Sequence, residues 1–100
     1  MEDELKRLAR IMKALSNENR LSLYLQIYKQ DKMAIDKQEC FVSHIAHHLN
    51  IGAPTVSHHI KELENAGLIT LSRVGKQVTA SINPSTQALV QKVLTAPEKL

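Results

Sequence analysis

The sequence predicts a mainly α-helical domain with one small β-hairpin, a winged helix-turn-helix of about five helices and a two-stranded wing. Three observations lead to this prediction. Between residues 41 and 65, two short stretches with helical spacing of apolar residues flank the turn Asn50-Ile51-Gly52. After Gly67, two stretches with alternating apolar residues flank Gly75-Lys76. One hundred residues suffice for one small domain, so we expect residues 1–100 to form a single winged helix-turn-helix domain.

The composition limits the classes of protein to which the chain can belong. Only three residues are aromatic, so the core must be aliphatic. The net charge of +3 and the sequence pI of about 9.2 are compatible with a nucleic-acid partner. A single cysteine, Cys40, excludes an internal disulfide and fits a cytoplasmic protein. No apolar run is long enough to span a membrane, and the amphipathic N-terminus differs from a signal peptide.

The first and last helices are expected over residues 2–15 and 84–94. Apolar residues recur at helical spacing in the first helix, at Leu5, Leu8, Ala9, Met12 and Leu15. The last helix follows Asn83-Pro84, and its apolar residues are Ala88, Leu89, Val90, Val93 and Leu94. Both helices are apolar on more than one side, which favours burial against a second subunit. We therefore expect a homodimer interface formed by Leu5, Leu8, Met12, Leu89 and Val93.

The second helix is expected from Glu18 to Gln30, with Asn17 as its N-cap. Its apolar face is expected to have an edge formed by Leu21, Leu25 and Tyr28, with Tyr24 and Ile27 beside them. Residues 31–39 are polar and mixed in charge, which is typical of a loop. A helical turn around Met33 to Ile35 is compatible with this loop.

The central prediction is the pair of helices around the turn at residues 50–52. The helix from Val42 to Leu49 should bury its apolar side, which consists of Ile45, Ala46 and Leu49. Pro54 suits the first turn of the next helix, where its missing N–H costs nothing. The buried stripe of that helix should comprise Val56, Ile60 and Leu63, and Gly67 should end it.

The outward face of this fourth helix follows from the rotation of about 100° per residue. If Val56 points inward, Ser57, His58, Lys61 and Asn65 point outward, whereas His59 flanks the buried stripe and is ambiguous. Hydroxyl, imidazole, amine and amide groups can contact phosphates and base edges, although any surface helix also carries polar residues. The glycine-containing turn before the helix and the hairpin after it favour the DNA interpretation.

The hairpin should present a basic tip. Ile69 and Leu71 in the first strand, and Val78, Ala80 and Ile82 in the second, alternate with polar residues and give the hairpin one apolar face. Gly75-Lys76 between the strands suits a type II′ turn. The expected contacts to double-stranded DNA come from the fourth helix and this tip, and they are Pro54, Thr55, Ser57, His58, Lys61, Arg73, Lys76 and Gln77. A dimer would make about six phosphate contacts through Lys61, Arg73 and Lys76, which predicts salt-sensitive binding.

Several segments together resemble the ArsR-type (arsenic-repressor) winged-helix family. They are ALSNENRLSLYLQI, ECFVSHIAHHLNIGAPTVSHHIKELENAGLI, and the hairpin around SRVGKQV with its INP exit. The similarity covers nearly the whole chain, and its most specific pieces are PTVSHHIKELENAGLI and NENRL. The resemblance implies a homodimeric bacterial or archaeal repressor whose first and last helices form the dimer interface. In this family an inducer, often a metal ion, weakens operator binding.

The metal-binding positions of that family are altered in this chain. Metal-binding members carry E-L-C-V-C-D-L at the start of the third helix, and Phe41 and Ser43 stand at the two thiolate positions here. Phenylalanine has no donor atom, and serine is a poor ligand for a soft metal. Other members bind zinc or nickel through Asp and His on the last helix, but PSTQALVQKVL contains neither. We therefore expect no metal site of either kind and no cofactor.

Two other sensing sites stay open as alternatives. His44 and His48 are spaced four apart, which can bind a divalent metal, but two histidines without a carboxylate form an incomplete site. A polar face near DNA phosphate is the simpler explanation of the histidines. Cys40 could act as a redox thiol, although a lone cysteine is more often a packing residue. An unknown small inducer also remains compatible with the sequence.

The main functional prediction is a DNA-binding transcriptional repressor. A protein-interaction module is the alternative, but its recognition face should be apolar, unlike that of the fourth helix. An enzyme is not expected, because the sequence shows no nucleophile–base pair, phosphate loop or complete metal set.

Overall fold

The computed structural model describes residues 3–32 and 41–100, apart from the side chains of Lys32 and His48. The predicted order of helices and hairpin is confirmed, and a short 3₁₀-helix (η1) follows it. The elements are α1 (Glu4–Leu15), α2 (Glu18–Lys32), α3 (Val42–Leu49), α4 (Ala53–Asn65), β1 (Ile69–Val74), β2 (Gln77–Ile82), α5 (Pro84–Thr95) and η1 (Pro97–Lys99). The predicted turn at residues 33–35 and Cys40 lie outside the described residues.

Three helices, α1, α2 and α5, begin where a short polar side chain accepts a hydrogen bond from the first turn. Asp3 accepts from the backbone N–H of Lys6 at 2.9 Å, and Asn17 accepts from that of Arg20 at 3.0 Å. Asn83 does the same for the backbone N–H of Ser85 at 3.1 Å. The predicted cap at Asn17 is confirmed.

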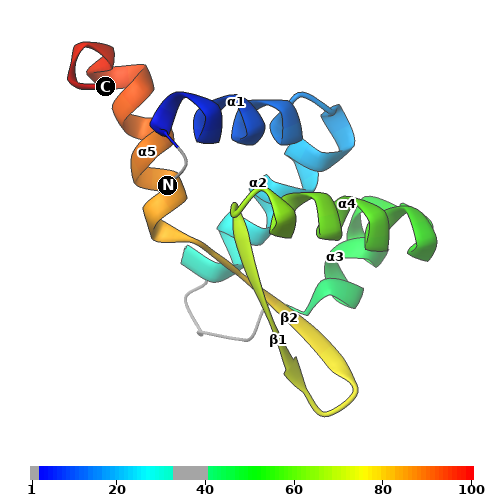
Figure 1. The fold of residues 1–100 in the computed structure, drawn as a ribbon. Coiled ribbons are helices and arrows are strands. Elements are labelled where there is room, and N and C mark those ends of the chain that lie inside the picture. The colour runs from blue at the N-terminus through cyan, green and yellow to red at the C-terminus, as the bar shows by residue number, and fades with distance from the viewer. Residues whose placement is uncertain (1–2, 33–40) are drawn as a thin grey trace.

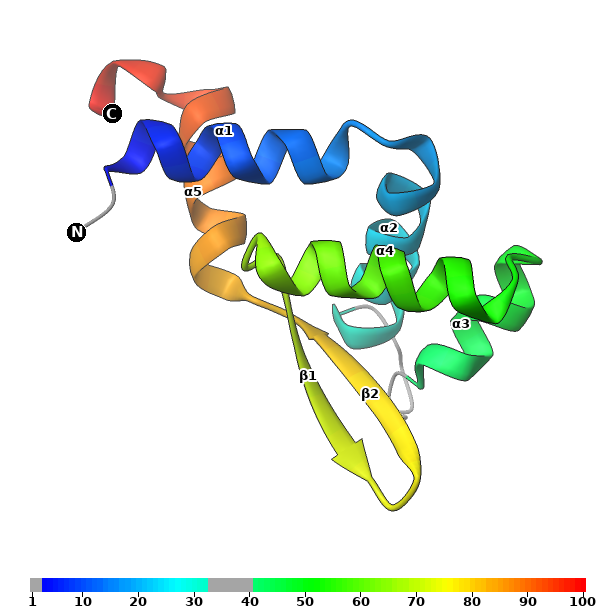
Figure 2. The same ribbon diagram turned by 45° about the vertical axis from the view of Figure 1, so that its right-hand side comes forward.

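The helices form one body from which the hairpin projects (Figures 1 and 2). α1 and α5 lie at one end of this body, next to both termini, whereas α3 and α4 lie near the base of the hairpin. No helix among the described residues is long and apolar enough to cross a membrane. α5 begins at the base of the hairpin, directly after β2, whereas the tip of the wing lies far from α1 and from the C-terminal end of α5.

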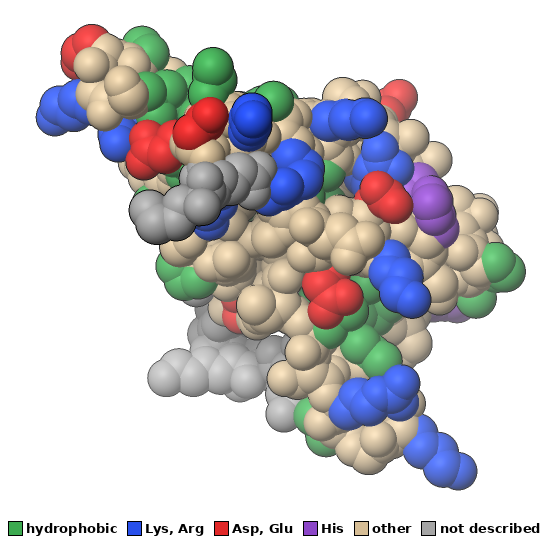
Figure 3. All heavy atoms as spheres, viewed as in Figure 1, with side chains coloured by type: hydrophobic (Ala, Val, Ile, Leu, Met, Phe, Trp, Pro, Cys, Tyr) green, Lys and Arg blue, Asp and Glu red, His purple; other side chains and the backbone are tan. Residues whose placement is uncertain are grey.

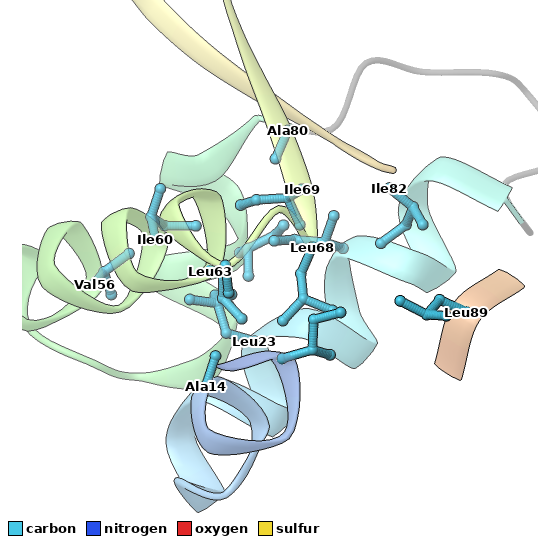
Figure 4. Packing of buried hydrophobic residues seen from close by; sticks show 14 of the residues in the cluster. Ala14, Leu23, Val56, Ile60, Leu63, Leu68, Ile69, Ala80, Ile82 and Leu89 are labelled. Atoms are coloured by element: carbon cyan, nitrogen blue, oxygen red, sulfur yellow. The ribbon is translucent and has the colours of Figure 1, made fainter. Parts of the chain in front are cut away.

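The core is aliphatic, as the composition predicts, and it joins all the helices except η1 to the base of the hairpin (Figure 4). Val56, Ile60 and Leu63 point into it from α4, which confirms the predicted stripe. The other buried apolar residues are Leu8, Ile11, Ala14, Leu23, Ile27, Ile45, Ala66, Leu68, Ile69, Ala80, Ile82 and Leu89.

The predicted apolar face of α2 is confirmed at Tyr24, Ile27 and Tyr28, which pack in or against the core, but it is wrong at Leu21 and Leu25. Leu23 and Ile27 are fully buried, whereas Leu21 and Leu25 are 40% and 47% exposed. This helix has apolar residues on several sides, so spacing alone does not select the side that meets the core.

In α1 the buried side is also shifted from the predicted stripe. It comprises Leu8, Ile11 and Ala14, whereas Leu5 is 74% and Met12 is 37% exposed.

The hairpin has the predicted faces and turn. Its antiparallel register pairs Ile69 with Ile82 and Leu71 with Ala80. At the tip, Gly75 has a φ of +63°, and Lys76 has no positive φ, as a type II′ turn requires.

Gly67 ends α4 with a left-handed backbone, at a φ of +77°. Its N–H donates to the carbonyl of Glu64, and the N–H of Leu68 donates to that of Leu63. This is the Schellman arrangement, and it turns the chain from the recognition helix into β1. An added Cβ would have room, since its nearest neighbour is the Thr86 hydroxyl oxygen at 3.6 Å.

We predict that Gly67→Ala lowers the free energy of unfolding by about 1–2 kcal/mol, because alanine is strained in the left-handed region. Gly67→Asn is the matched comparison, and it should cost less because asparagine tolerates this conformation. Urea unfolding followed by circular dichroism measures both. Equal losses in the two variants would show that the backbone conformation is not the cause.

Candidate nucleic-acid interface

The fourth helix has one buried side and one exposed side. Its inner side packs into the core through Val56, Ile60 and Leu63. On the other side, Ser57, His58, Lys61 and Asn65 are all exposed, as predicted. The structure therefore confirms that these polar side chains are available to a partner.

The turn before α4 leaves the start of this helix open. Asn50 adopts the left-handed backbone with a φ of 55°, whereas Gly52 has a φ of −62° and caps α4 without a side-chain hydrogen bond. Pro54 and Thr55 are exposed in the first turn. Because no side chain caps the first N–H groups, the positive end of the helix can accept a phosphate.

A hollow of about 240 Å³ lies between α3, the start of α4 and the wing tip. Ser57, Lys76 and Gln77 all line it, so the fold brings together predicted contacts that are up to 20 residues apart. Ser43 lines it as well, and its hydroxyl donates to Oε1 of Gln77 at 3.2 Å. The hollow thus offers hydroxyl, amine and amide groups to a single bound group.

Positive side chains continue over the face that contains α4. Lys and Arg side chains lie over α1, over α4 and over the wing on this face, with a few acidic side chains between them (Figure 3). Arg73 and Lys76 are exposed on the hairpin, and Lys61 is exposed on α4. This distribution suits a polyanion that follows the face from the wing to the helical body.

A partly buried hydrogen-bond network connects the end of α4 to the terminal helices. The carbonyl of Gly67 accepts from the hydroxyl of Thr86 at 2.6 Å and from the amide of Asn83 at 2.8 Å. Arg7 of α1 donates to the hydroxyls of Ser85 and Thr86 at 2.9 and 3.2 Å. The recognition helix therefore has a fixed position relative to α1 and α5.

His59 faces inward, which resolves its ambiguity. Its side chain is 6% exposed, and its Nδ1 has no hydrogen-bond partner among the described residues. Burial lowers the pKa of His59 below 6.5, and the positive charge of Arg20 and the neighbouring His58 lower it further, whereas Glu62 opposes the shift. His59 is thus held neutral and belongs to the packing of α4.

Sequence reasoning missed Ser43 and Thr86. The Ser43 bond joins residues 34 positions apart, and only the folded hairpin brings them together. Thr86 is fully buried, although a threonine near the start of a helix reads as a surface residue. The one indication in the sequence is that Thr86 lies three residues after the N-cap Asn83, in the first turn of α5.

The chain matches the family model described as "Bacterial regulatory protein, arsR family" over residues 33–70. This match covers α3, the turn and α4. The helix-turn-helix segment of this chain is therefore similar to that of the ArsR family. The predicted resemblance is thereby confirmed.

Solved structures extend the similarity to the whole ArsR-type fold. An ArsR-like transcriptional regulator from Rhodococcus has a TM-score of 0.72 and 17% identity, covering 95% of this chain and 83% of that one. A homodimeric winged helix-turn-helix DNA-binding domain from Mycobacterium bovis has a TM-score of 0.70 and 24% identity, and the match covers 95% of this chain and 82% of that one. The transcriptional repressor BigR from Xylella fastidiosa has a TM-score of 0.64 and 21% identity, and the match covers 92% of this chain and 88% of that one. No curated protein matches the chain by sequence.

These comparisons show that the chain has a winged helix-turn-helix fold and that residues 33–70 are similar to bacterial regulatory proteins of the ArsR family. The residues at the family's thiolate positions have other contacts here. The ring of Phe41 packs edge-on against that of His44, with centroids 5.5 Å apart, and Ser43 bonds to Gln77. The described residues contain no group of three or more potential metal ligands. The side chain of His48 lies outside the described residues, so the His44–His48 pair stays a prediction.

We predict that His59→Leu flattens the dependence of stability on pH below about 6.5. Because the pKa of His59 is lower in the folded chain, the unfolded chain takes up the proton first as the pH falls. The stability contributed by neutral His59 is therefore full above 6.5 and is lost as the pH falls from there through the folded pKa. At pH 8 the variant should be as stable as wild type or about 1 kcal/mol more stable, since an unpartnered buried nitrogen is removed.

Urea unfolding of both proteins between pH 5 and pH 8 measures this difference. His47→Leu is the control, because His47 is exposed and is not among the groups that shift the pKa of His59. If His59→Leu keeps the wild-type dependence on pH, the neutral state of His59 is refuted.

Proposed function

We propose that the chain is a homodimeric repressor that binds operator DNA sequence-specifically and lacks the thiolate and last-helix metal sites of its family. One observation carries the DNA part. All eight predicted contacts are exposed on α4 and the wing, namely Pro54, Thr55, Ser57, His58, Lys61, Arg73, Lys76 and Gln77. The polar character of this surface argues against a protein-interaction module. An operator-binding role would put the protein in the cytoplasm, with the DNA.

In this proposal α4 enters the major groove and the wing contacts the flanking backbone. Ser57 and His58 lie in the first half of α4, where recognition helices contact base edges. Lys76 lies at the tip of a hairpin that projects from the helical body, as a phosphate contact beside the groove requires (Figure 2). Base reading is thus assigned to the first half of α4, and phosphate binding to the wing together with Lys61 of α4.

The proposed dimer surface consists of apolar side chains that the single chain leaves exposed. Leu5 and Leu94 are both 74% exposed, and Met12 is 37% exposed. Leu8 and Leu89 are buried in the chain's own core and so have little surface to offer a partner, and Val93 is half-buried. The similar Mycobacterium bovis domain is homodimeric, which supports this part of the proposal.

The proposed absence of the family's metal sites is supported by the donor atoms available. Phe41 has none, the hydroxyl of Ser43 already donates to Gln77, and α5 contains no Asp, Glu, His or Cys. The proposed operator release therefore involves a different inducer.

Fluorescence anisotropy with DNA from upstream of the protein's own gene tests the function. We expect binding that is at least about 10³-fold tighter than to a random duplex of the same length, as is typical of specific complexes. Equal affinity for the two duplexes would refute sequence-specific binding.

We predict different effects for two single substitutions. Lys76→Ala should lower the slope of log affinity against log salt by about 0.9 for each phosphate that the side chain neutralises. His58→Ala should leave this slope nearly unchanged and change the preference among operator variants by about 1–3 kcal/mol, since base contacts carry sequence discrimination. Salt titrations on two operator variants measure both. If Lys76→Ala changed the sequence preference and His58→Ala changed the salt slope, the assigned roles would be contradicted.

We predict that Leu5→Lys weakens the dimer more than tenfold, because removal of a leucine from a buried position costs about 1.5–3 kcal/mol. Leu21→Lys is the matched control, since Leu21 is also exposed but lies on α2. Sedimentation equilibrium gives both dissociation constants. If the two variants dimerise alike, the assignment of α1 to the interface is wrong.

A further inference from the structure

A second hollow, of about 220 Å³, lies between α1, α2 and α4. Three cationic side chains line it, two from α1 and one from α2, namely Arg10, Lys13 and Arg20. Glu62 and Asn65 line it from α4. The charged groups sum to +2, so the hollow has the electrostatics of a site for an anion.

Arg20 is the fixed part of this hollow. Its Nε donates to the backbone carbonyl of Ala14 at 2.8 Å, which orients the half-buried guanidinium. The two Nη groups have no hydrogen-bond partner among the described residues, and the ammonium of Lys13 has no ion pair among them. An oriented guanidinium with free N–H groups matches the oxygen atoms of a phosphate.

Asn65 connects the hollow to the recognition face. Ser57, Lys61 and Asn65 are spaced four apart on α4, so they form one row along its exposed side. The row begins at the hollow beside the wing, which Ser57 lines, and ends at the hollow beside α1, which Asn65 lines. The two hollows therefore lie at opposite ends of one face of α4, about 12 Å apart along the helix.

This separation fits DNA that lies across α4. The major groove is about 12 Å wide and has a phosphate backbone on each side. Lys and Arg side chains lie over α1 as well as over the wing on the same face (Figure 3). A duplex read by the middle of α4 would therefore bring one backbone to the wing and the other toward α1.

We propose that the hollow between α1, α2 and α4 binds a phosphate group of the DNA backbone through Lys13 and Arg20. This inference rests on the proposed function and adds α1 and α2 to the DNA interface. Phosphate binding carries no sequence information, so the inference can be tested on a random duplex.

The test compares the full-length wild type with Lys13→Gln on a random 30-base-pair duplex. Each phosphate contact that the substitution removes should lower the slope of log affinity against log salt by about 0.9. Between 50 and 200 mM salt, the affinity of wild type should thus fall about 3.5-fold more than that of the variant for each such contact. Lys99→Gln is the control, because it removes the same charge from an exposed residue of η1.

Equal slopes for Lys13→Gln and Lys99→Gln would overturn the proposal, as would a wild type that binds no duplex. The preference for the operator is measured in the separate anisotropy experiment. Equal binding to every duplex would refute the sequence-specific function, but the salt slopes on the random duplex would still test this hollow. Thermal melting checks that Lys13→Gln is folded, which we expect because glutamine is a good helix former.

A second arm distinguishes backbone phosphate from a free anion. Amide signals of residues 10–20 and 62–66 are followed by NMR during titration with pyrophosphate, with chloride at matched ionic strength as reference. Weak, unsaturated shifts up to 10 mM pyrophosphate, together with shifts of the same amides on adding duplex, support the DNA assignment. Saturation below 1 mM, with an unchanged DNA slope for Lys13→Gln, would assign the hollow to a free anion and refute the proposal.

Discussion

The carbonyl oxygen of Gly67 is the point through which the parts of this fold are joined. It follows the last turn of α4, and it accepts hydrogen bonds from Thr86 and Asn83, which begin α5. Arg7 of α1 binds the same threonine. A single peptide group thus fixes the recognition helix, the start of the hairpin and both terminal helices relative to one another. Since Thr86 is fully buried, water cannot replace these bonds without opening the core.

The chemistry of α4 differs sharply between its two sides. Inside, His59 is kept neutral by burial and by the nearby charge of Arg20. Outside, Ser57, His58 and Lys61 remain in water. Arg20 therefore has two electrostatic roles. It disfavours the protonated form of His59 on the inner side of α4, and it offers N–H groups at the surface beside the end of α4. Both roles follow from the hydrogen bond that holds its guanidinium against the end of α1.

The sequence predicts best those features that one or two residues determine locally. The helix from Val42 to Leu49 has the predicted bounds, and Gly67 and Gly75 have the positive φ that their predicted roles require. At Gly67 and Gly75 the local signal is decisive, because glycine adopts a positive φ without the steric cost that other residues have there.

Features that depend on several elements are predicted less well. The buried side of α2 contains Leu23 rather than Leu21 or Leu25, because a helix with apolar residues on several sides can be placed only by its neighbours. Lys13, Arg20 and Asn65 come from three helices, and no spacing in the sequence relates them. The orientation of the α4 face is predictable from helical rotation, but the hollows at its two ends are not.

The hairpin has a further consequence for the shape of the DNA that this protein can accept. Each strand has six paired residues and the turn has two, so the arm has a definite length of about 20 Å. Insertion of one residue would both lengthen the arm and rotate the following side chains to the opposite face, which would remove Ala80 and Ile82 from the core. The length of the arm is therefore set by the six residue pairs of the register and by the packing at its base. In the proposed function, this length sets the distance between α4 and the phosphates that the wing can reach.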